Sequence, residues 1–366
     1  MKTNNLIMET VHKFFFKNSS DMSEVKSDTI DLVITSPPYP MIEMWDALFS
    51  TLNEDIQQSL QEGDGNSAFN LMHEELEKIW NEVVRVVKPG GIVCINVGDA
   101  TRNINKSFQL FTNHVRITTF FQNHGFIVLP CILWRKPTNS PNKFLGSGML
   151  PTNAYVTLEH EYILIFRKGD KKRKLPPGFE HRYNSAYFWE ERNKWFSDLW
   201  ADIRGMPQKL NNINGNKKKL RERSAAFPLK LPYRLINMFS IYGDTVLDPF
   251  WGTGTTTLAA MVSGRNSIGY EINSEFLEGF KLNLKELKNT TQSINNNRIK
   301  THIEFIESYK KSGKEPKYLA NNYKFPVITK QEIEILLFSI KNYSESGNKF
   351  TVNYSKFELE QKKKLI

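Results

Sequence analysis

The order of apolar and polar residues in the first third of the chain predicts strands that alternate with helices. Leu32–Thr35 is a short apolar run of the kind found in buried strands. In His73–Val87 the apolar residues recur every three or four positions and predict a helix, which the turn residues Lys88–Gly91 end. Gly91–Val97 is again almost continuously apolar and predicts a second buried strand.

The same alternation continues toward the middle of the chain. A helical pattern ends near Asn123–Gly125, and a strand pattern runs from there to Trp134. Leu158–Gly169 predicts a further strand that ends in a basic turn. Because the connecting helices cover both faces of such a sheet, this order predicts an α/β fold with a doubly wound, mostly parallel sheet.

An interruption follows. From Lys168 to Arg223 the chain is basic and aromatic without clear periodicity, and after it the order helix, strand, helix, strand resumes in Phe227–Ile272. The simplest interpretation is an insertion with a task of its own. We therefore expect two halves of one domain at 1–168 and 225–288, an inserted region at 169–224 and a C-terminal extension of unknown role at 289–366, whose segments Glu332–Ile340 and Lys349–Ser355 are apolar enough to pack.

The composition favours a polyanionic partner and a reducing compartment. The 366 residues carry a formal net charge of +10, which favours nucleic acid or an anionic surface, although the codon bias of an AT-rich genome produces the same excess. Cys94 and Cys131 lie in apolar runs, as buried free thiols do. No signal-peptide core and no apolar run of about 18 residues is present, so we expect a cytoplasmic protein without membrane contact.

One stretch has the form of a ligand-binding turn. In Val246–Ala260 an acid, Asp248, ends a strand, and Gly252 and Gly254 follow in a tight turn, where a β-carbon would collide with a closely approaching ligand. Thr255 and Thr256 then suit the first turn of a helix.

A second acid, Glu271, ends the next strand about twenty residues later, where an acid can bind both hydroxyls of a ribose. A dinucleotide fingerprint needs a third glycine where Thr257 stands, and the Lys of a P-loop is absent. Without a phosphate signature, the turn favours a nucleoside ligand such as S-adenosylmethionine. A purely structural turn is the alternative.

A stiff loop, Ser36-Pro37-Pro38-Tyr39, follows the first strand. In a doubly wound sheet it opens on the same edge as the glycine turn. The prolines remove donors and fix the backbone, so the Ser36 hydroxyl and the Pro37 carbonyl suit an exocyclic amine. Tyr39 offers a flat face for a base removed from its stack, unless it is simply a core tyrosine in a proline-rich turn.

These segments resemble the amino-methylating DNA methyltransferases that use S-adenosylmethionine. Thr35–Tyr39 resembles their catalytic motif and Asp248–Thr256 their cofactor motif. Phe227–Pro228, Leu158–Gly169 and Lys88–Gly91 are similar to further motifs of the family. The catalytic motif precedes the cofactor motif, as in the permuted beta class, whose target-recognition region lies between the two.

The resemblance implies roles for individual residues. Ser36, Pro37, Pro38 and Tyr39 would hold the target base. Asp248, Pro249, Phe250, Gly252, Gly254, Thr255, Thr256, Glu271 and Phe227 would form the cofactor pocket. The family's upstream Gly-Asp pair is replaced by KNSSD, so Asn18 or Asp21 would face the cofactor adenine.

The resemblance also bears on the base. Family members with Ser at the first motif position mostly methylate cytosine N4, and those with Asp or Asn mostly adenine N6. We therefore expect cytosine N4, with adenine N6 as the alternative. Methylation at cytosine C5 needs an exposed thiolate, whereas Cys131 lies in a strand pattern. The histidines and cysteines have no metal-ligand spacing, so no metal is expected.

The expected partner is double-stranded DNA. Candidate phosphate and base contacts are Lys171, Lys172, Arg173, Lys174, Arg192, Arg204, Lys217, Lys218, Lys219, Arg221 and Arg223, although any single cluster has a solvated basic surface as its alternative. Thr138–Asn153 would support a flipped base. A restriction endonuclease of the same specificity is a further expected partner. Methylation of RNA or of a protein glutamine, and a non-catalytic nucleic-acid-binding module, are the rival functions.

Overall fold

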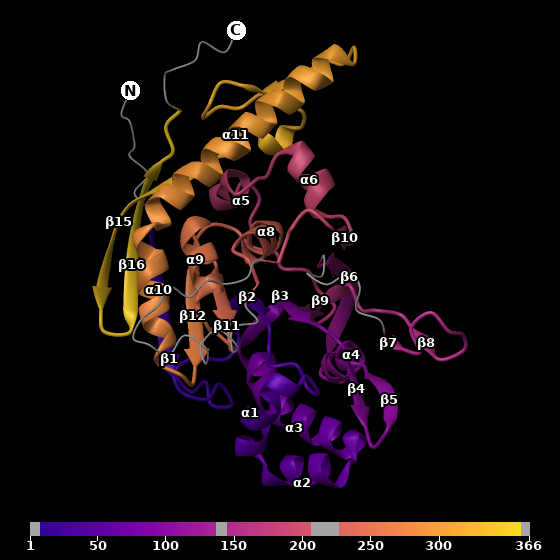
Figure 1. The fold of residues 1–366 in the computed structure, drawn as a ribbon. Coiled ribbons are helices and arrows are strands. Elements are labelled where there is room, and N and C mark those ends of the chain that lie inside the picture. The colour runs from indigo at the N-terminus through magenta and orange to yellow at the C-terminus, as the bar shows by residue number, and fades with distance from the viewer. Residues whose placement is uncertain (1–7, 137–144, 206–226, 360–366) are drawn as a thin grey trace.

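A sheet of ten strands forms the centre of the computed structural model, which describes residues 8–136, 145–205 and 227–359 (Figure 1). The strands lie in the order β10-β6-β9-β3-β2-β11-β12-β1-β16-β15. In that order they are Leu199–Trp200, Phe126–Arg135, His160–Lys168, Val87–Val97, Ile30–Thr35, Thr245–Asp248, Asn266–Glu271, Met8–Phe16, Lys349–Lys356 and Phe338–Ser346.

Most of these strands run in one direction. The central strands β3, β2, β11, β12 and β1 pair in parallel, whereas β9 is antiparallel to both of its neighbours and β16 to both of its own. The two halves of the sheet meet at the β2–β11 pair, although these strands are more than 200 residues apart in sequence. The expected doubly wound, mostly parallel α/β fold is confirmed.

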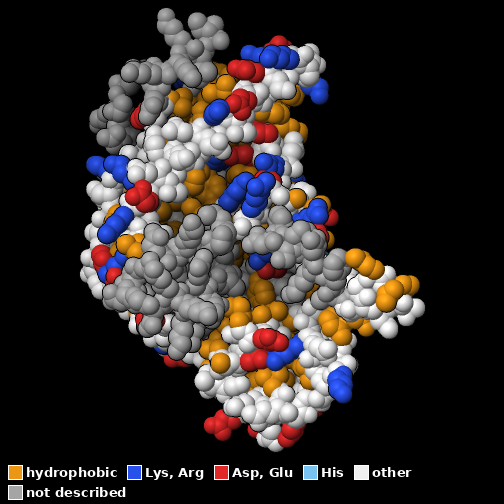
Figure 2. All heavy atoms as spheres, in the orientation of Figure 1, with side chains coloured by type: hydrophobic (Ala, Val, Ile, Leu, Met, Phe, Trp, Pro, Cys, Tyr) orange, Lys and Arg blue, Asp and Glu red, His pale blue; other side chains and the backbone are white. Residues whose placement is uncertain are grey.

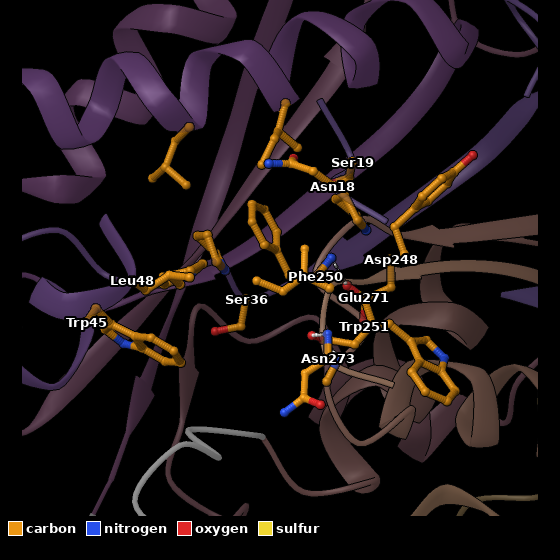
Figure 3. Close-up of a pocket in the computed structure, with 18 of the residues that line it drawn as sticks. Asn18, Ser19, Ser36, Trp45, Leu48, Asp248, Phe250, Trp251, Glu271 and Asn273 are labelled. Carbon is orange, nitrogen blue, oxygen red and sulfur yellow. Dashed lines mark hydrogen bonds between the residues drawn. The ribbon is translucent and has the colours of Figure 1, made fainter. Parts of the chain in front are cut away.

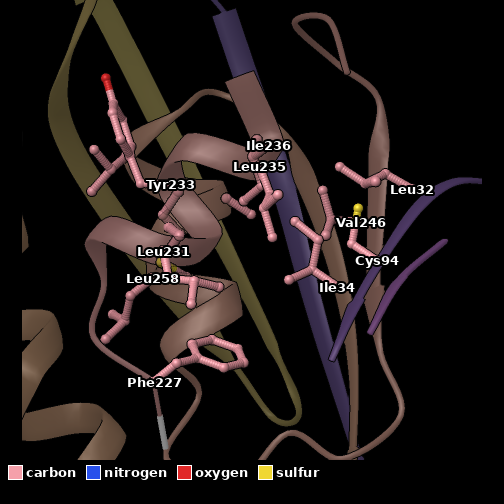
Figure 4. Close-up of a cluster of buried hydrophobic side chains, with 14 of the residues drawn as sticks. Leu32, Ile34, Cys94, Phe227, Leu231, Tyr233, Leu235, Ile236, Val246 and Leu258 are labelled. Atoms are coloured by element: carbon pink, nitrogen blue, oxygen red, sulfur yellow. The ribbon is translucent and has the colours of Figure 1, made fainter. Parts of the chain in front are cut away.

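Helices cover both faces of the sheet. Helices α8 (Lys230–Phe239), α9 (Thr255–Val262) and α10 (Phe276–Lys285) bury one apolar cluster, part of which is drawn in Figure 4. On the other face, α3 (Gly65–Val86) and α4 (Asn113–Asn123) bury a second cluster. Each cluster excludes water from one side of the strands, so the strands are apolar on both faces.

Two boundaries differ from the prediction. The helix expected at His73–Val87 begins at Gly65, because the Asp64 side chain accepts a hydrogen bond from Ser67 N at 2.9 Å and caps the helix. Lys88–Gly91, expected to be a turn, belongs to β3. The register shift between β2 and β3 lies at this point, and Gly90 has φ of +80°, so the segment is an irregular start of the strand.

The C-terminal extension adds to the same sheet. Strand β16 pairs antiparallel with β1, and β15 completes the edge. The expected boundary at residue 288 falls just inside α11 (Leu287–Lys311), which contacts β15. The extension therefore continues the central architecture.

The described part of the inserted region joins this extension. Strand β10 pairs with β6, and helices α5 (Glu180–Asn184) and α6 (Trp189–Trp195) lie near α11 (Figure 1). A third apolar cluster contains Phe188 from the insertion and Ile299, Tyr323 and Leu337 from the extension. The insertion and the extension thus share a core.

Shorter elements make up the remaining helices and strands of the described residues. They are η1 (Glu43–Trp45), α1 (Asp46–Leu52), α2 (Glu54–Glu62), β4 (Ala100–Ile104), β5 (Ser107–Phe111), β7 (Leu145–Gly146), β8 (Ala154–Tyr155), β13 (Tyr318–Leu319), β14 (Pro326–Val327) and η2 (Lys330–Glu332). The β7–β8 hairpin projects from the body and carries apolar side chains at its surface, where Met149 is 79% exposed (Figure 2).

Candidate active site

The stiff loop and the glycine turn lie side by side. Strand β2 ends at Thr35 and β11 at Asp248, and the pairing sets Val246 opposite Leu32 and Leu247 opposite Val33. The Thr35 hydroxyl donates a hydrogen bond to Asp248 Oδ1 at 2.7 Å. The two loops therefore leave the sheet at one edge, at the point where the strand order reverses, which is where ligands bind in such folds.

A cavity of about 670 Å³ opens between these loops, a size typical of small-molecule sites. Figure 3 shows Ser36 on one side of it and Asp248, Phe250 and Glu271 on the other. Its lining includes most of the residues expected from the sequence, namely Ser36, Pro37, Pro38, Phe227, Asp248, Pro249, Phe250, Gly252, Thr255, Glu271 and Asn18.

A further wall of the cavity was not predicted from the sequence. It comes from the short helices η1 and α1 and from α3, and the side chains of Trp45 and Leu48 point toward the space in Figure 3. In Glu43–Leu52 polar and apolar residues alternate without a clear helical or strand repeat. The sequence therefore did not indicate that this stretch lines a ligand cavity. It makes one side of the cavity largely apolar.

The two glycines of the turn have different reasons to be glycine. Both have positive φ, +51° at Gly252 and +72° at Gly254. A β-carbon on Gly254 would meet Phe280 at 2.4 Å and Trp251 at 2.7 Å, so the expectation that it makes room for a ligand is corrected: it makes room for the protein's own rings. Gly252 lines the cavity, and the nearest atom to its β-carbon would be Phe250 O at 3.9 Å.

Glu271 is held by the backbone of the turn. Its Oε2 accepts a hydrogen bond from Gly252 N at 2.8 Å, and its Oε1 accepts one from Asn273 N at 2.9 Å. Burial raises the pKa of this carboxyl, and the backbone donors act against that rise. The carboxylate therefore has a fixed orientation at the cavity wall, with lone pairs left for hydroxyl donors.

Asp248 is almost fully enclosed. Burial raises its pKa from 3.8 to about 6, against the hydrogen bonds from the Thr256 and Thr35 hydroxyls and from Phe250 N. Thr256 is itself buried and lies behind Asp248, whereas Thr255 faces the cavity. Asp248 thus fixes the loop geometry as well as lining the site.

The two candidates for the adenine contact are separated by the structure. Asn18 lines the cavity. Asp21 forms an ion pair with Lys17 at 2.8 Å, and its side chain is 66% exposed. This salt bridge and the Ser23 hydrogen bonds lower the pKa of Asp21 to about 2, so its charge is already matched outside the cavity.

Tyr39 is 7% exposed, so its ring offers little open surface. The β-carbon of an alanine at Gly98 would meet the ring at 3.2 Å. The Tyr39 hydroxyl lies 2.9 Å from Ser36 Oγ and donates to Glu161 Oε2 at 3.0 Å. Asn96 Nδ2 donates to the same hydroxyl at 2.8 Å. Sequence patterns missed Asn96 and Glu161 as site residues, since Asn96 is a single polar residue in a strand pattern and Glu161 is one of several polar residues at the start of another.

The predicted DNA contacts are not gathered at this edge. Arg173 forms ion pairs with Asp244 at 2.6 Å and with Asp31 at 3.2 Å, at the amino ends of β11 and β2. The cluster Lys171, Lys172, Arg173, Lys174 therefore lies at the opposite edge of the sheet from Ser36, and its contact with DNA phosphates stays a prediction.

Other basic candidates are placed differently. Arg192 on α6 and Arg204 after β10 are exposed, and Figure 2 shows basic side chains over this part of the molecule. Lys217, Lys218, Lys219, Arg221 and Arg223 lie outside the described residues, as does part of Thr138–Asn153.

The described residues give little support for a cysteine nucleophile, a metal site or a membrane span. Cys94 is buried and Cys131 half-buried, both in strands. Burial raises the pKa of the Cys94 thiol, which makes it inert. Within the three described segments, no cluster of His, Cys, Asp or Glu has a metal-binding arrangement. No helix in those segments has the length and apolarity needed to span a membrane.

Comparison with known proteins agrees with this geometry. The family model described as DNA methylase, N6_N4_Mtase, matches residues 30–282. The type II methyltransferase M.MthZI of Methanothermobacter thermautotrophicus is 55% identical over 343 residues, covering 93% of this chain and 94% of the relative. M.MjaI of Methanocaldococcus jannaschii, also a type II methyltransferase, is 53% identical over 72% of this chain and 88% of its own length.

A solved structure gives the same result. TTHA0409 of Thermus thermophilus, complexed with S-adenosyl-L-methionine, superposes with a TM-score of 0.58 at 29% identity, covering 75% of this chain and 94% of that one. The matched family model spans both the stiff loop and the glycine turn of the cavity. The chain therefore belongs to the N6/N4 family of DNA methylases.

Proposed function

We propose that this DNA methyltransferase transfers a methyl group from S-adenosylmethionine to the N4 amine of a flipped cytosine in duplex DNA, at a specific sequence. The observation that carries the proposal is the single cavity between Ser36 and Glu271, whose two loops are joined by the Thr35–Asp248 hydrogen bond. A methyl donor and an acceptor amine need such a shared space, because direct transfer requires the two reacting atoms to be aligned at short distance.

The cavity suits S-adenosylmethionine, which supplies a methyl group activated by a sulfonium. Glu271 would accept hydrogen bonds from the ribose hydroxyls, as acids do at this position of such sheets. Asn18 would contact the adenine, and Gly252 would let the backbone approach the ligand. Asp248, Phe227 and Thr255 would enclose the rest of the molecule. The complex of TTHA0409 with this cofactor supports the assignment.

The stiff loop would orient the target amine. The lone pair of the cytosine amine is delocalised into the base ring. Hydrogen bonds from the amine protons to Ser36 Oγ and the Pro37 carbonyl would localise that lone pair toward the methyl group. The sulfonium–methyl bond breaks as the nitrogen–methyl bond forms, and the amine then loses one proton to water. No covalent enzyme intermediate is needed. Pro38 keeps the loop rigid and Tyr39 supports it from behind.

Three features support the choice of base and context. Serine rather than a carboxylate or amide opens the motif, which favours cytosine N4 over adenine N6 in proteins of this family. The motif order indicates the beta class, with residues 169–224 as the target-recognition region. The relatives M.MthZI and M.MjaI are type II methyltransferases, which supports a restriction–modification context with a partner endonuclease.

Mass spectrometry of nucleosides tests this proposal. Duplex DNA with many sequence contexts is incubated with the protein and S-adenosylmethionine, digested and analysed. We expect N4-methylcytosine, and about a hundredfold less or lower still from a Ser36→Ala control in the same time. N6-methyladenine would overturn the assignment of the base, and the absence of any methylated nucleoside would overturn the activity.

A further inference from the structure

A buried hydrogen-bond network lies directly behind Ser36. It brings together Tyr39 from the stiff loop, Asn96 near the carboxyl end of β3 and Glu161 near the amino end of β9. Glu161 Oε2 accepts from Asn96 Nδ2 at 2.6 Å and from the Tyr39 hydroxyl at 3.0 Å. Its other oxygen, Oε1, is ion-paired with Lys136. The roles proposed above leave Asn96, Glu161 and Lys136 unused.

The direction of each bond in this network follows from Glu161. A carboxylate can only accept, so the Tyr39 proton and one Asn96 proton must point toward it. Turning the Asn96 amide over would set its oxygen against the carboxylate oxygen. Asn96 Oδ1 has no hydrogen-bond partner among the described residues, so the nitrogen alone anchors the amide.

These directions determine the state of Ser36. The Tyr39 oxygen accepts from Asn96 Nδ2 at 2.8 Å, while its own proton is committed to Glu161. The contact of 2.9 Å between Tyr39 Oη and Ser36 Oγ can then be a hydrogen bond only if Ser36 is the donor. With its proton directed at Tyr39, Ser36 Oγ presents lone pairs to the cavity that it lines.

We propose that Glu161 is a positioning residue that makes Ser36 an obligate hydrogen-bond acceptor for the target amine. The proposal rests on the function proposed above. A hydroxyl, unlike a carboxylate, can donate or accept, and a donating Ser36 would oppose an amine that carries two protons. Lys136 keeps the Glu161 carboxylate in place by pairing with its far oxygen.

The protonation state of Tyr39 agrees with this arrangement. Burial and the nearby Glu161 charge raise the pKa of the Tyr39 phenol well above its usual value, so it keeps its proton. A neutral phenol is required, because a phenolate could not donate to Glu161.

A double-mutant cycle with Glu161 and Tyr39 tests the proposal. Glu161→Gln keeps the shape but places an NH₂ group against either Lys136 or the Asn96 and Tyr39 protons. Glu161→Leu removes the acceptor, which leaves Ser36 Oγ as the nearest acceptor for the Tyr39 proton. We expect both variants to lower kcat by about tenfold to a hundredfold, while the Kd for S-adenosylmethionine and the KM for DNA change less than about threefold.

The Tyr39→Phe background distinguishes positioning from support of the fold. Without the Tyr39 hydroxyl, Glu161 cannot direct Ser36, so Glu161→Gln should lower kcat less than about twofold further. Glu159→Gln is the matched control, because Glu159 lies two residues away in an exposed pair with Arg135 at 3.0 Å, and its kcat should equal that of the unsubstituted protein.

Four results would be decisive. Equal losses from Glu161→Gln with and without the Tyr39→Phe substitution would overturn the proposal, as would normal kcat in both Glu161 variants. Loss of cofactor binding together with kcat would assign Glu161 to the fold and overturn it as well. If the unsubstituted protein itself transfers no methyl group, the proposed function falls, and this proposal with it.

Discussion

The carboxyl of Asp248 joins the two loops of the site, and its burial has a thermodynamic cost. Its pKa of about 6 in the folded protein lies above the value of 3.8 for an exposed aspartate. The native state therefore binds this proton more tightly than the unfolded state. The group favours folding at low pH, and that contribution is lost as the pH rises from about 4 to about 6.

Asp248→Asn tests this at the residue scale. Asparagine keeps an acceptor for Thr35 and Phe250 N without a charge, so the variant should be more stable than the unsubstituted protein at pH 8, by up to about 3 kcal/mol. The difference should shrink toward pH 4. Thermal unfolding without cofactor measures it, and a stability difference independent of pH would contradict the account.

Ser36→Ala removes the hydroxyl that faces the target amine. We expect kcat to fall by about a hundredfold or more, with the Kd for S-adenosylmethionine unchanged within about twofold, because Ser36 stands on the far side of the cavity from Glu271. Single-turnover kinetics and calorimetry measure the two quantities. Weakened cofactor binding with unchanged turnover would move Ser36 out of the catalytic role.

Glu271→Gln addresses the other side of the cavity. The amide keeps one acceptor but brings a donor against Gly252 N or Asn273 N, so the turn should lose its fixed geometry. We expect the Kd for S-adenosylmethionine to rise about tenfold or more. Glu275→Gln, at an exposed position nearby, is the control and should leave the Kd unchanged. Equal affinities for Glu271→Gln and the unsubstituted protein would refute the ribose assignment.

At the scale of elements, one glycine of the turn matters for the stability of the fold and the other for cofactor binding. Gly254→Ala adds a β-carbon against Trp251 and Phe280 at positive φ, and should lower the free energy of unfolding by about 3 kcal/mol or more. Gly252→Ala meets only the strain of positive φ, about 1–2 kcal/mol, but narrows the cofactor cavity. Denaturant unfolding and calorimetry should therefore rank the two variants in opposite order, and the same order in both would contradict this division.

The central strands were predictable because they are buried on both faces. Leu32–Ile34 within β2 is a continuous apolar run and Ile268–Tyr270 within β12 is a short one, and both strands end at the motifs of the site. Strand β1 was missed, since His12 and Thr10 stand among its apolar residues. These side chains satisfy each other through a hydrogen bond of 2.8 Å inside the sheet, a long-range arrangement that a local pattern does not reveal.

The site was predictable to the same degree and for a related reason. Motif residues at strand ends were found because strand ends determine where a ligand binds in this fold. Asn96 and Glu161 were missed because their importance depends on contact with Tyr39 across neighbouring strands. The position of Lys171–Lys174 at the opposite edge of the sheet was not predicted, since a run of charges does not indicate which edge its turn occupies.

At the scale of the whole molecule, the inserted region and the C-terminal extension are joined by a shared apolar cluster and an ion pair. Glu191 on α6 and Arg298 on α11 form a buried bidentate ion pair at 2.6 and 2.8 Å. We infer that the extension holds the described part of the inserted region in place.

Breaking this pair tests the inference. Arg298→Met leaves the Glu191 charge buried and uncompensated, and should lower the free energy of unfolding by about 3–5 kcal/mol. Adding Glu191→Gln should recover part of the loss, because the unpaired charge is then removed. Denaturant unfolding of the two variants gives the comparison, and additive losses would contradict a direct pairing between insertion and extension.

The central claim is that one cavity receives both the cofactor and the target amine. A crystal structure with sinefungin, in which an amine replaces the methyl-bearing sulfonium, tests it most directly. The account predicts both ribose hydroxyls within hydrogen-bond distance of Glu271 and the ligand's amine directed toward Ser36. Sinefungin bound outside this cavity, or with its amine turned away from Ser36, would contradict it.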